Sequence, residues 1–439
     1  MQIFRVDGME GEVLVIGLGR IGLPVALVAA DSGFVVRGVD SSEASISSLR
    51  EMMSPFEEPG LGELIQKYSG NNFLPMTWDE ANKSDFEDVR WIVVTIGVHV
   101  LPYPKPADIS ILHTIIDDLM ARDSLKGRTL ILRTTLPIGT TSLVAKYIEK
   151  STNLVVGKDL NLAFIPERLV EGMAISEERS LPKIIGPVNP EALSEAKELF
   201  SQIGGGLVEM SNSDSAEFVK LIDNAWRHTR FAFSNDAAVA ASAHGVDITE
   251  IINSANQDYD RNSIALPGPV SGYCLGKDPL IFEYAFQNVE PKRELPSVWL
   301  TALRSSQALV PWTVNRVKGS RVLVAGLSFK EDIDDFRMAF SEPLIKSLLD
   351  AGHQVSVCDP KLGSNAYTQL WPNLANNIID SGTDLVMMLN KNKYDTVIMA
   401  VRHSIWKDYG PEFVGKGLII DLWNSYRNTS GIERIGLGS

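Results

Sequence analysis

One stretch of the chain combines a thiol with a backbone that a ligand can approach: Leu266 to Leu280, "LPGPVSGYCLGKDPL". Cys274 is one of only two cysteines in 439 residues, and three glycines and three prolines surround it. Glycine-rich backbone admits a ligand closely, and an ammonium nearby, such as that of Lys277, would make the thiol a nucleophile. The alternative is a buried structural cysteine, the commonest state of a Cys outside a disulfide. We expect that state for Cys358 in "VSVCD" and a reactive thiol in a loop for Cys274.

A second stretch could hold the phosphates of a nucleotide. Gly17, Gly19 and Gly22 form a G-x-G-x-x-G pattern between a predicted strand and a predicted helix. In this pattern the glycines permit a tight turn, close approach of a pyrophosphate, and close packing of helix and strand. Asp40 ends the next predicted strand, 18 residues after the last glycine, where its carboxylate can bind ribose hydroxyls and favours NAD over NADP. The alternative is a glycine-rich turn that binds no nucleotide.

Three further groups of polar residues lie near predicted strand ends or on one helical face. Thr135 in "LRTTLPIGTT" follows a strand, at the sheet edge where ligands bind, although threonine also suits turns and helix caps. Glu167 and Glu171 are spaced four apart and could share one helical face. Lys220 and Asn224 in "FVKLIDNAWR" are likewise helical neighbours. For both pairs the alternative is a solvated, charged surface.

The elements that must position these residues alternate between strand and helix at both ends of the chain. Apolar, β-branched runs such as "RWIVVTIG" and "GRTLILRTT" alternate with helical stretches, as in a parallel sheet. From about Asp214, some thirty residues keep helical apolar spacing without a proline, enough for a helix over about 40 Å long. From Gly319 the α/β pattern restarts. We therefore predict an α/β fold with two Rossmann-like parallel-sheet domains joined by a central helical domain with one long helix, at residues 1–212, 213–315 and 316–439.

Composition narrows the classes of partner. A net charge of -14 argues against a nucleic-acid surface or an anionic-membrane surface. Two cysteines fit a reducing compartment. The N-terminus lacks the basic and apolar regions of a signal peptide, and no apolar run approaches the length that spans a bilayer. We expect a cytoplasmic protein with no nucleic-acid or membrane partner and no metal site.

Taken in order, the motifs resemble those of the UDP-sugar 6-dehydrogenases, a family that includes UDP-glucose, UDP-N-acetylhexosamine and GDP-mannose enzymes. The resemblance covers roughly residues 11–427 and rests on eight motifs: "GLGRIGLP", "PFEEPGLGELI", "TTLPIGTT", "IPERLVEG", "AEFVKLIDNAWR", "GYCLGKDP", "GLSFKEDIDDFR" and "DLWN". It implies that a sugar primary alcohol becomes a carboxylate while two NAD are reduced. In this family a thiolate traps the aldehyde as a thiohemiacetal, which is oxidised to a thioester and hydrolysed.

The resemblance also implies roles for individual residues. Cys274 would be the nucleophile, and Lys220 and Asn224 would stabilise the oxygen at the 6-position. Asp278 and Thr135 would orient the hydrolytic water, and Glu167 would do acid–base work. The other expected cofactor contacts come from Gly17, Gly19, Ile21, Gly22, Asp40, Thr95, Thr135, Lys277 and Arg337. The expected substrate contacts come from Glu167, Glu171, Lys220, Asn224, Arg227, Arg261, Gly272 and Lys330, with Arg261 crossing a homodimer interface and Lys330 and Arg337 near the nucleotide half.

At some positions the sequence departs from the family pattern, and these positions bear on which sugar the enzyme would oxidise. Pro269, Ser271 and Tyr273 replace the usual residues before the cysteine, and "FRMAFSEP" carries a short insertion. "NAWR", with Arg227, resembles a branch that acts on UDP-N-acetylhexosamines such as UDP-ManNAc or UDP-GlcNAc. The alternatives are a UDP-glucose 6-dehydrogenase, a two-electron alcohol dehydrogenase of the wider hydroxyacid-dehydrogenase superfamily, and a non-catalytic nucleotide-sugar-binding protein.

Overall fold

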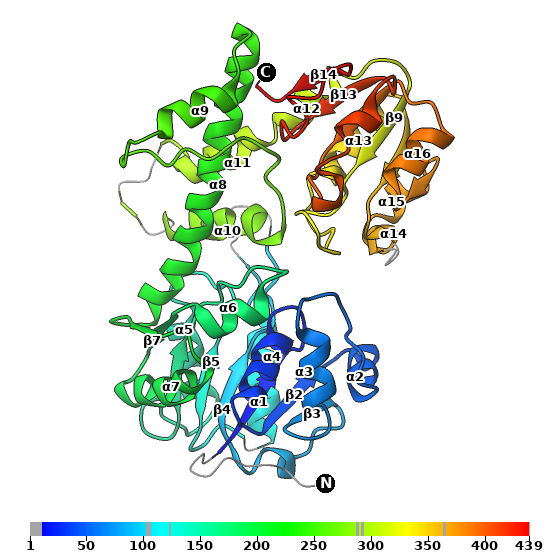
Figure 1. Ribbon diagram of the computed structural model, residues 1–439. Helices are drawn as coiled ribbons and strands as arrows, with labels where there is room; N and C mark the ends of the chain where they lie inside the picture. Colours follow the sequence, from blue (N-terminus) through cyan, green and yellow to red (C-terminus); the bar gives the residue numbers. More distant parts are fainter. Residues whose placement is uncertain are drawn as a thin grey trace. The chain divides into compact units, whose positions relative to one another are not determined.

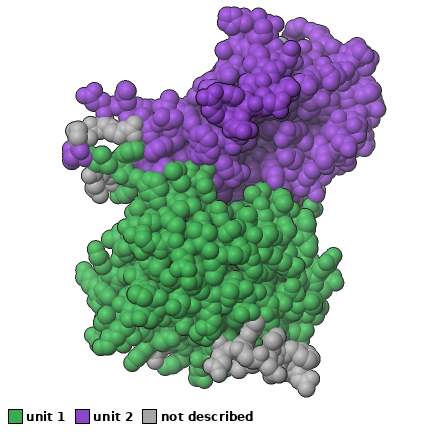
Figure 2. Space-filling model, turned by 60° about the vertical axis from the view of Figure 1, so that its left-hand side comes forward, with its two compact units in different colours: residues 1–223, 284–289 green, residues 224–283, 290–439 purple. Residues whose placement is uncertain are grey.

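A computed structural model describes residues 11–101, 107–122, 124–286, 289–290, 294–362 and 366–438. Residues 1–10, on which part of the signal-peptide prediction rests, lie outside this range. The chain forms two compact units, shown in different colours in Figure 2. The first unit comprises residues 1–223 and 284–289, and the second comprises residues 224–283 and 290–439. The three-domain division at residues 1–212, 213–315 and 316–439 stays a prediction.

The first unit is built on an eight-stranded sheet of order β3-β2-β1-β4-β5-β6-β7-β8. All its neighbouring strands are parallel except β6 and β7. The strands are β1 (Glu12–Ile16), β2 (Val36–Asp40), β3 (Phe73–Thr77), β4 (Val89–Val94), β5 (Thr129–Leu132), β6 (Asn161–Phe164), β7 (Lys183–Pro187) and β8 (Leu207–Glu209). The helices between them are α1 (Gly22–Asp31), α2 (Glu43–Arg50), α3 (Leu61–Tyr68), α4 (Ser110–Ala121), α5 (Thr140–Ser151), α6 (Ala174–Ser180) and α7 (Pro190–Ile203).

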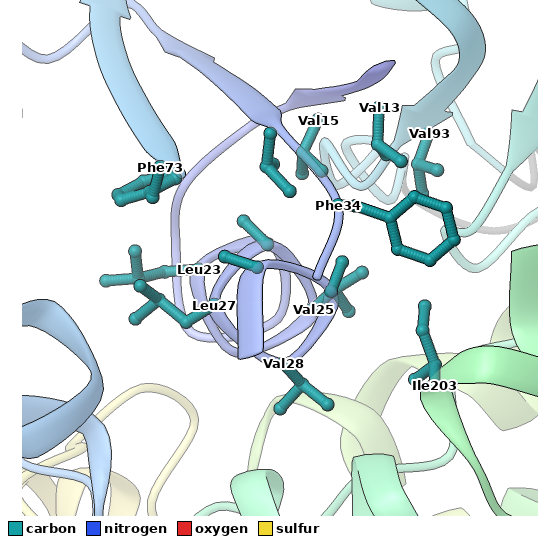
Figure 3. Close-up of a cluster of buried hydrophobic side chains, with 14 of the residues drawn as sticks. Val13, Val15, Leu23, Val25, Leu27, Val28, Phe34, Phe73, Val93 and Ile203 are labelled. Atoms are coloured by element: carbon teal, nitrogen blue, oxygen red, sulfur yellow. The ribbon is translucent and has the colours of Figure 1, made fainter. Parts of the chain in front are cut away.

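Helix α1 packs against the sheet through an almost wholly apolar sequence, "GLPVALVAAD". Strand β1 is buried along its whole length and apolar after Glu12, as expected of a parallel strand covered on both faces. Figure 3 shows the side chains that meet there. They are Leu23, Val25, Leu27 and Val28 of α1, Val13 and Val15 of β1, Val93 of β4, and Phe34, Phe73 and Ile203. This packing fixes the start of α1, and with it the glycine turn, at the carboxyl end of β1.

The second unit contains a six-stranded, fully parallel sheet of order β11-β10-β9-β12-β13-β14. Its strands are β9 (Arg321–Ala325), β10 (Gln354–Cys358), β11 (Ser381–Gly382), β12 (Thr396–Met399), β13 (Leu418–Asp421) and β14 (Glu433–Gly436). Its helices include α9 (Ile248–Asn256), α10 (Tyr273–Glu283), α11 (Val298–Ser306), α12 (Leu309–Val314), α13 (Ser341–Asp350), α14 (Ala366–Leu370), α15 (Pro372–Ala375) and α16 (Leu385–Lys391). The six strands repeat the order of β1 to β6, so the prediction of two Rossmann-like sheets is confirmed.

Helix α8 (Ser213–His244) is the predicted long helix and runs for 32 residues without interruption. At 1.5 Å per residue its length is about 48 Å, and Figure 1 shows it as one continuous helix. The boundary between the two units falls within it, after Asp223. Within the described ranges, none of the helices combines the length and the apolar character needed to cross a membrane.

Candidate active site

The glycine turn between β1 and α1 has the geometry of a phosphate-binding loop. Gly17 has a φ of 94°, in the left-handed region that glycine adopts without strain. A side chain at Gly22 would place its Cβ 1.7 Å from the Gly17 carbonyl oxygen, so only glycine fits there. At Gly19 an added Cβ would meet nothing within 4 Å. The backbone is therefore open at Gly19, the position where a pyrophosphate approaches most closely.

Asp40 lies beside this turn at the end of β2. Its Oδ2 accepts a hydrogen bond of 2.7 Å from the Leu18 backbone N–H, and its Oδ1 accepts one of 2.9 Å from the Ser42 N–H. The carboxylate is only half-buried and keeps further lone pairs for ribose hydroxyls. Across the turn, Thr95 donates from Oγ1 to the Gly17 carbonyl oxygen at 2.8 Å. These residues fit NAD, which accepts a hydride when bound, and Ile21 precedes α1 at the same turn.

The corresponding turn of the second sheet is closed. Gly326, after β9, has a φ of 92°, and Asp359, after β10, accepts from the Leu327 N–H at 2.7 Å, as Asp40 does from Leu18. Asp359, however, is fully buried, and His403 Nε2 lies 3.2 Å from its Oδ2. Because a ribose cannot reach this carboxylate, the first sheet is the one that fits a dinucleotide.

The segment that holds Glu167 and Glu171 is not helical, so the expectation that they share a helical face is wrong. The backbone N–H of Val170 is bonded to the Glu177 carboxylate at 2.7 Å rather than to a preceding carbonyl, and the Leu169 N–H is bonded to Glu167. The segment therefore stays non-helical and ends in a turn at Glu171 and Gly172, before α6 begins at Ala174. Carboxylate oxygens thus accept the N–H hydrogen bonds that backbone carbonyl oxygens would accept in a helix.

Glu167 and Lys220 nevertheless meet in the first unit. Lys220 Nζ, on α8, lies 3.4 Å from Glu167 Oε2, and both residues are buried. A buried ammonium next to a carboxylate can stabilise a developing oxyanion or share a proton. Thr135, half-buried, follows β5 at the carboxyl edge of the same sheet.

Asn224 and Asp278 form the corresponding buried pair of the second unit. Asn224 Nδ2 donates to Asp278 Oδ2 at 2.6 Å, and Lys277 Nζ lies 2.5 Å from the other carboxylate oxygen. Asp278 is fully buried. Lys277 also lies over the Tyr273 ring, 4.9 Å from its centre, and Arg337 lies 5.3 Å from the centre of the same ring. The predicted Asn224 and Asp278 therefore share one hydrogen-bonded cluster.

Cys274 lies in a helix, so the predicted loop is wrong at this point. It is exposed in the first turn of α10, with Asp278 one turn further along. Gly272, with a φ of 97°, precedes the helix, and its N–H donates to the Met338 carbonyl oxygen at 3.0 Å. Ser271 Oγ donates to the Phe329 carbonyl oxygen at 2.8 Å. Two hydrogen bonds to the turn after β9 thus fix the start of α10, where the helix dipole stabilises negative charge.

The remaining predicted residues are more exposed. Arg227 is exposed on α8, and Arg261, also exposed, stacks on the Tyr259 ring at 4.6 Å. Lys330 is half-buried in the turn after β9, and Arg337 pairs with Asp335. Of these four residues, Arg337 reaches the Asn224–Asp278 cluster through the Tyr273 ring, which Lys277 also contacts.

Sequence reasoning missed two residues that support the first unit's site. Glu217, buried on α8, accepts hydrogen bonds from the N–H groups of Gly139 and Thr141 and from the Thr141 hydroxyl, at 2.6 to 2.8 Å. It thereby caps the start of α5. Arg20, inside the glycine motif, pairs with Glu171 at 3.7 Å. Nothing in the sequence around Glu217 predicts its role. Arg20 could have been found from the sequence, because it lies inside the glycine motif.

Comparison with known proteins matches three domains of one enzyme family along the chain. Residues 11–204 match the NAD binding domain of the UDP-glucose/GDP-mannose dehydrogenase family, residues 214–303 its central domain, and residues 323–428 its UDP binding domain. A UDP-N-acetyl-D-mannosamine dehydrogenase of Methanocaldococcus jannaschii is 28% identical over 80% of either chain. A UDP-glucose 6-dehydrogenase of Haloferax volcanii is 29% identical over 81% of this chain and 84% of that protein.

Solved structures resemble the whole chain. The UDP-D-ManNAc dehydrogenase structure from Pyrococcus horikoshii has a TM-score of 0.84 at 24% identity, covering 97% of this chain and 99% of that one. A UDP-glucose dehydrogenase from Pyrobaculum islandicum has a TM-score of 0.86 at 21% identity, covering 100% of both chains. These similarities show the fold. The three domain matches make the chain a member of the UDP-glucose/GDP-mannose dehydrogenase family, an NAD-dependent UDP-sugar dehydrogenase.

Proposed function

We propose that the protein oxidises the primary alcohol at C6 of a UDP-N-acetylhexosamine to a carboxylate, in two steps that each reduce one NAD. The observation that carries this proposal is Cys274, exposed at the start of a helix that also presents Asp278. A UDP-N-acetyl-D-mannosamine dehydrogenase among the relatives supports UDP-ManNAc as the first substrate to test, with UDP-GlcNAc second.

The proposed reaction balances as follows. The alcohol loses a hydride to NAD and a proton to solvent, which gives an aldehyde. The Cys274 thiolate adds to that aldehyde, and the alkoxide takes up a proton to form a thiohemiacetal. The thiohemiacetal then loses a proton to solvent and a second hydride to a second NAD, and becomes a thioester. Water hydrolyses the thioester to the carboxylate and restores the thiol. Covalent capture keeps the aldehyde in place while the reduced cofactor is exchanged.

Each buried cluster has a role in this proposal. Lys220, held by Glu167, supplies a cation where negative charge develops on the C6 oxygen. Asn224 donates a hydrogen bond to the same oxygen. Asp278, which accepts a hydrogen bond from Asn224, orients the hydrolytic water together with Thr135. Glu167 acts as the general acid and base.

Further contacts of the proposed site follow the family pattern. We assign Glu171, Arg227, Gly272 and Lys330 to the substrate, and Lys277 and Arg337 to the cofactor. Arg261 would reach the substrate of the neighbouring subunit in a homodimer. A homodimer is supported by two apolar side chains on α8, Trp226 and Phe233, which are 60% and 62% exposed. The low cysteine content supports a cytoplasmic location.

The test is NAD reduction with a panel of UDP-ManNAc, UDP-GlcNAc, UDP-GalNAc, UDP-glucose and GDP-mannose, counting NADH per carboxylate formed. We expect two NADH per product and the highest kcat/KM with a UDP-N-acetylhexosamine. Cys274→Ser should stop turnover at or before thioester formation. Cys358→Ala, which alters the buried cysteine of β10, is the matched control and should retain activity. One NADH per product, or full carboxylate production by Cys274→Ser, would refute the mechanism.

A UDP-glucose 6-dehydrogenase is the second candidate, supported by the relative from Haloferax volcanii. The same panel separates the two, because kcat/KM would then be highest for UDP-glucose. Tight UDP-sugar binding without NAD reduction for any substrate would instead indicate a binding protein.

A further inference from the structure

Arg20 joins the glycine turn to the segment that carries Glu171. It stands between Gly19 and Ile21, and its guanidinium Nη1 lies 3.7 Å from Glu171 Oε2. The two side chains are only 20% and 16% exposed, so water screens the pair less than it screens a surface ion pair. The guanidinium also lies over the Phe56 ring, 5.1 Å from its centre. A residue of the glycine turn is thus held by two groups from other segments.

The segment around Glu171 has one further tie to the same region. Both oxygens of the Glu58 carboxylate accept hydrogen bonds of 2.8 Å, from the N–H groups of Gly172 and Ala174. Glu58 and Phe56 both belong to the short segment before α3. Residues 56–58, the glycine turn and the start of α6 therefore form one connected cluster, all within the first unit.

A bound dinucleotide would bring a second anion to Arg20. The pyrophosphate of NAD approaches the backbone at Gly19, the residue immediately before Arg20. Guanidinium binds phosphate oxygens at least as well as it binds carboxylates, often with two parallel hydrogen bonds. The carboxylate of Glu171 and the pyrophosphate then compete for one cation.

We propose that Arg20 exchanges between these two anions and so couples occupancy of the cofactor turn to Glu171. Without the dinucleotide, Arg20 holds Glu171. With the dinucleotide bound, Arg20 turns to the pyrophosphate and Glu171 becomes available to the sugar. In this inference, the binding of Glu171 to the sugar rests on the proposed function.

The exchange has a use in a double oxidation. The cofactor must leave and be replaced once while the intermediate stays on the enzyme. Thermodynamic linkage requires that, if the cofactor releases Glu171, a ligand of Glu171 strengthens cofactor binding by the same factor. Arg20 would then be a positioning residue that makes the two ligands bind cooperatively.

The test is NADH affinity, measured by fluorescence titration without any sugar nucleotide, for the wild type, Glu171→Gln, Arg20→Met and the double variant. Glu171→Gln keeps the shape of the side chain and removes the competing charge, so we expect it to tighten NADH binding about three- to tenfold. Arg20→Met should weaken binding. In the Arg20→Met background, Glu171→Gln should have no effect. Arg20→Lys keeps a cation and covers the case in which Arg20→Met folds poorly.

The matched control is Asp31→Asn, which removes the ion pairs that the end of α1 makes with Arg179 of α6 at 2.6 Å and with Lys67 of α3 at 3.2 Å. These pairs lie at the carboxyl end of α1, away from the glycine turn that precedes this helix, so their loss should leave NADH affinity unchanged. An unchanged affinity in Glu171→Gln, or the same gain in the Arg20→Met background, overturns the exchange. Because NADH binding needs no turnover, this result is independent of whether the double oxidation is confirmed.

Discussion

Replacing Glu217 by glutamine tests how α8 supports the segment that carries Thr135. The carboxylate is buried and caps α5 through three hydrogen bonds from Gly139 and Thr141. Glutamine offers only one acceptor oxygen and turns an NH₂ group toward the remaining N–H donor. Relative to the ionised carboxylate, one buried donor is left without an acceptor, which costs about 1 to 3 kcal/mol of unfolding free energy.

The charge of Glu217 makes this stability depend on pH. Burial raises the pKa of Glu217 from its ordinary 4.5 to about 7, although its hydrogen bonds with Thr141 and Gly139 oppose the shift. Because the folded state holds the proton more tightly, the contribution to stability is fully present below pH 4.5 and is lost as the pH rises through 7. At about 1.36 kcal/mol per pH unit, the wild type should lose about 2.5 kcal/mol between pH 5 and pH 8 from this group.

Glu217→Gln removes the titration, so the stability of the variant should stay constant between pH 5 and pH 8, while that of the wild type should fall by about 2.5 kcal/mol. The assay is hydrogen exchange of the amides in the first turns of α5, read at several pH values after correction for the intrinsic exchange rate. Glu43→Gln, in the exposed first turn of α2, is the control and should change neither stability nor its pH dependence. An unchanged pH dependence in Glu217→Gln would show that Glu217 does not titrate in this range.

Two further substitutions separate local geometry from ligand binding. Gly22→Ala places a Cβ 1.7 Å from the Gly17 carbonyl oxygen and should lower both melting temperature and NADH affinity, the latter by more than about tenfold. Gly19→Ala meets nothing within 4 Å, so its melting temperature should match the wild type while NADH affinity falls; equal effects at both positions would contradict the assigned turn. Asp359→Asn should destabilise β9 and β10 by about 3 kcal/mol in hydrogen exchange. Although burial opposes it, hydrogen bonding with His403 lowers the pKa of Asp359, so the wild type should lose this stability on acidification and the variant should not.

Much of the fold follows from local sequence. Buried parallel strands require continuous apolar runs, and β1, β4 and β5 were recognisable for that reason. The glycine turn was equally recognisable, because Gly17 and Gly22 sit where a side chain is sterically excluded. The long helix α8 follows from helical apolar spacing without proline.

Other features depend on contacts between distant residues. Glu167 and Glu171 have helical spacing, but the carboxylates of Glu167 and Glu177 take up backbone N–H groups that a helix would have used. Proline and glycine around Cys274 suggested a loop, yet hydrogen bonds from Ser271 and Gly272 to a turn some sixty residues away anchor a helix there.

The sequence by itself therefore determined the strands, the long helix, the glycine turn with Asp40, and the residues that resemble those of a known enzyme family. Only the tertiary structure decided which charges meet. Arg20 and Glu171, or Lys220 and Glu167, become partners because packed elements bring them within a few ångströms. Steric exclusion acts between near neighbours and can be read locally, whereas an ion pair between distant residues depends on the packing of the whole unit.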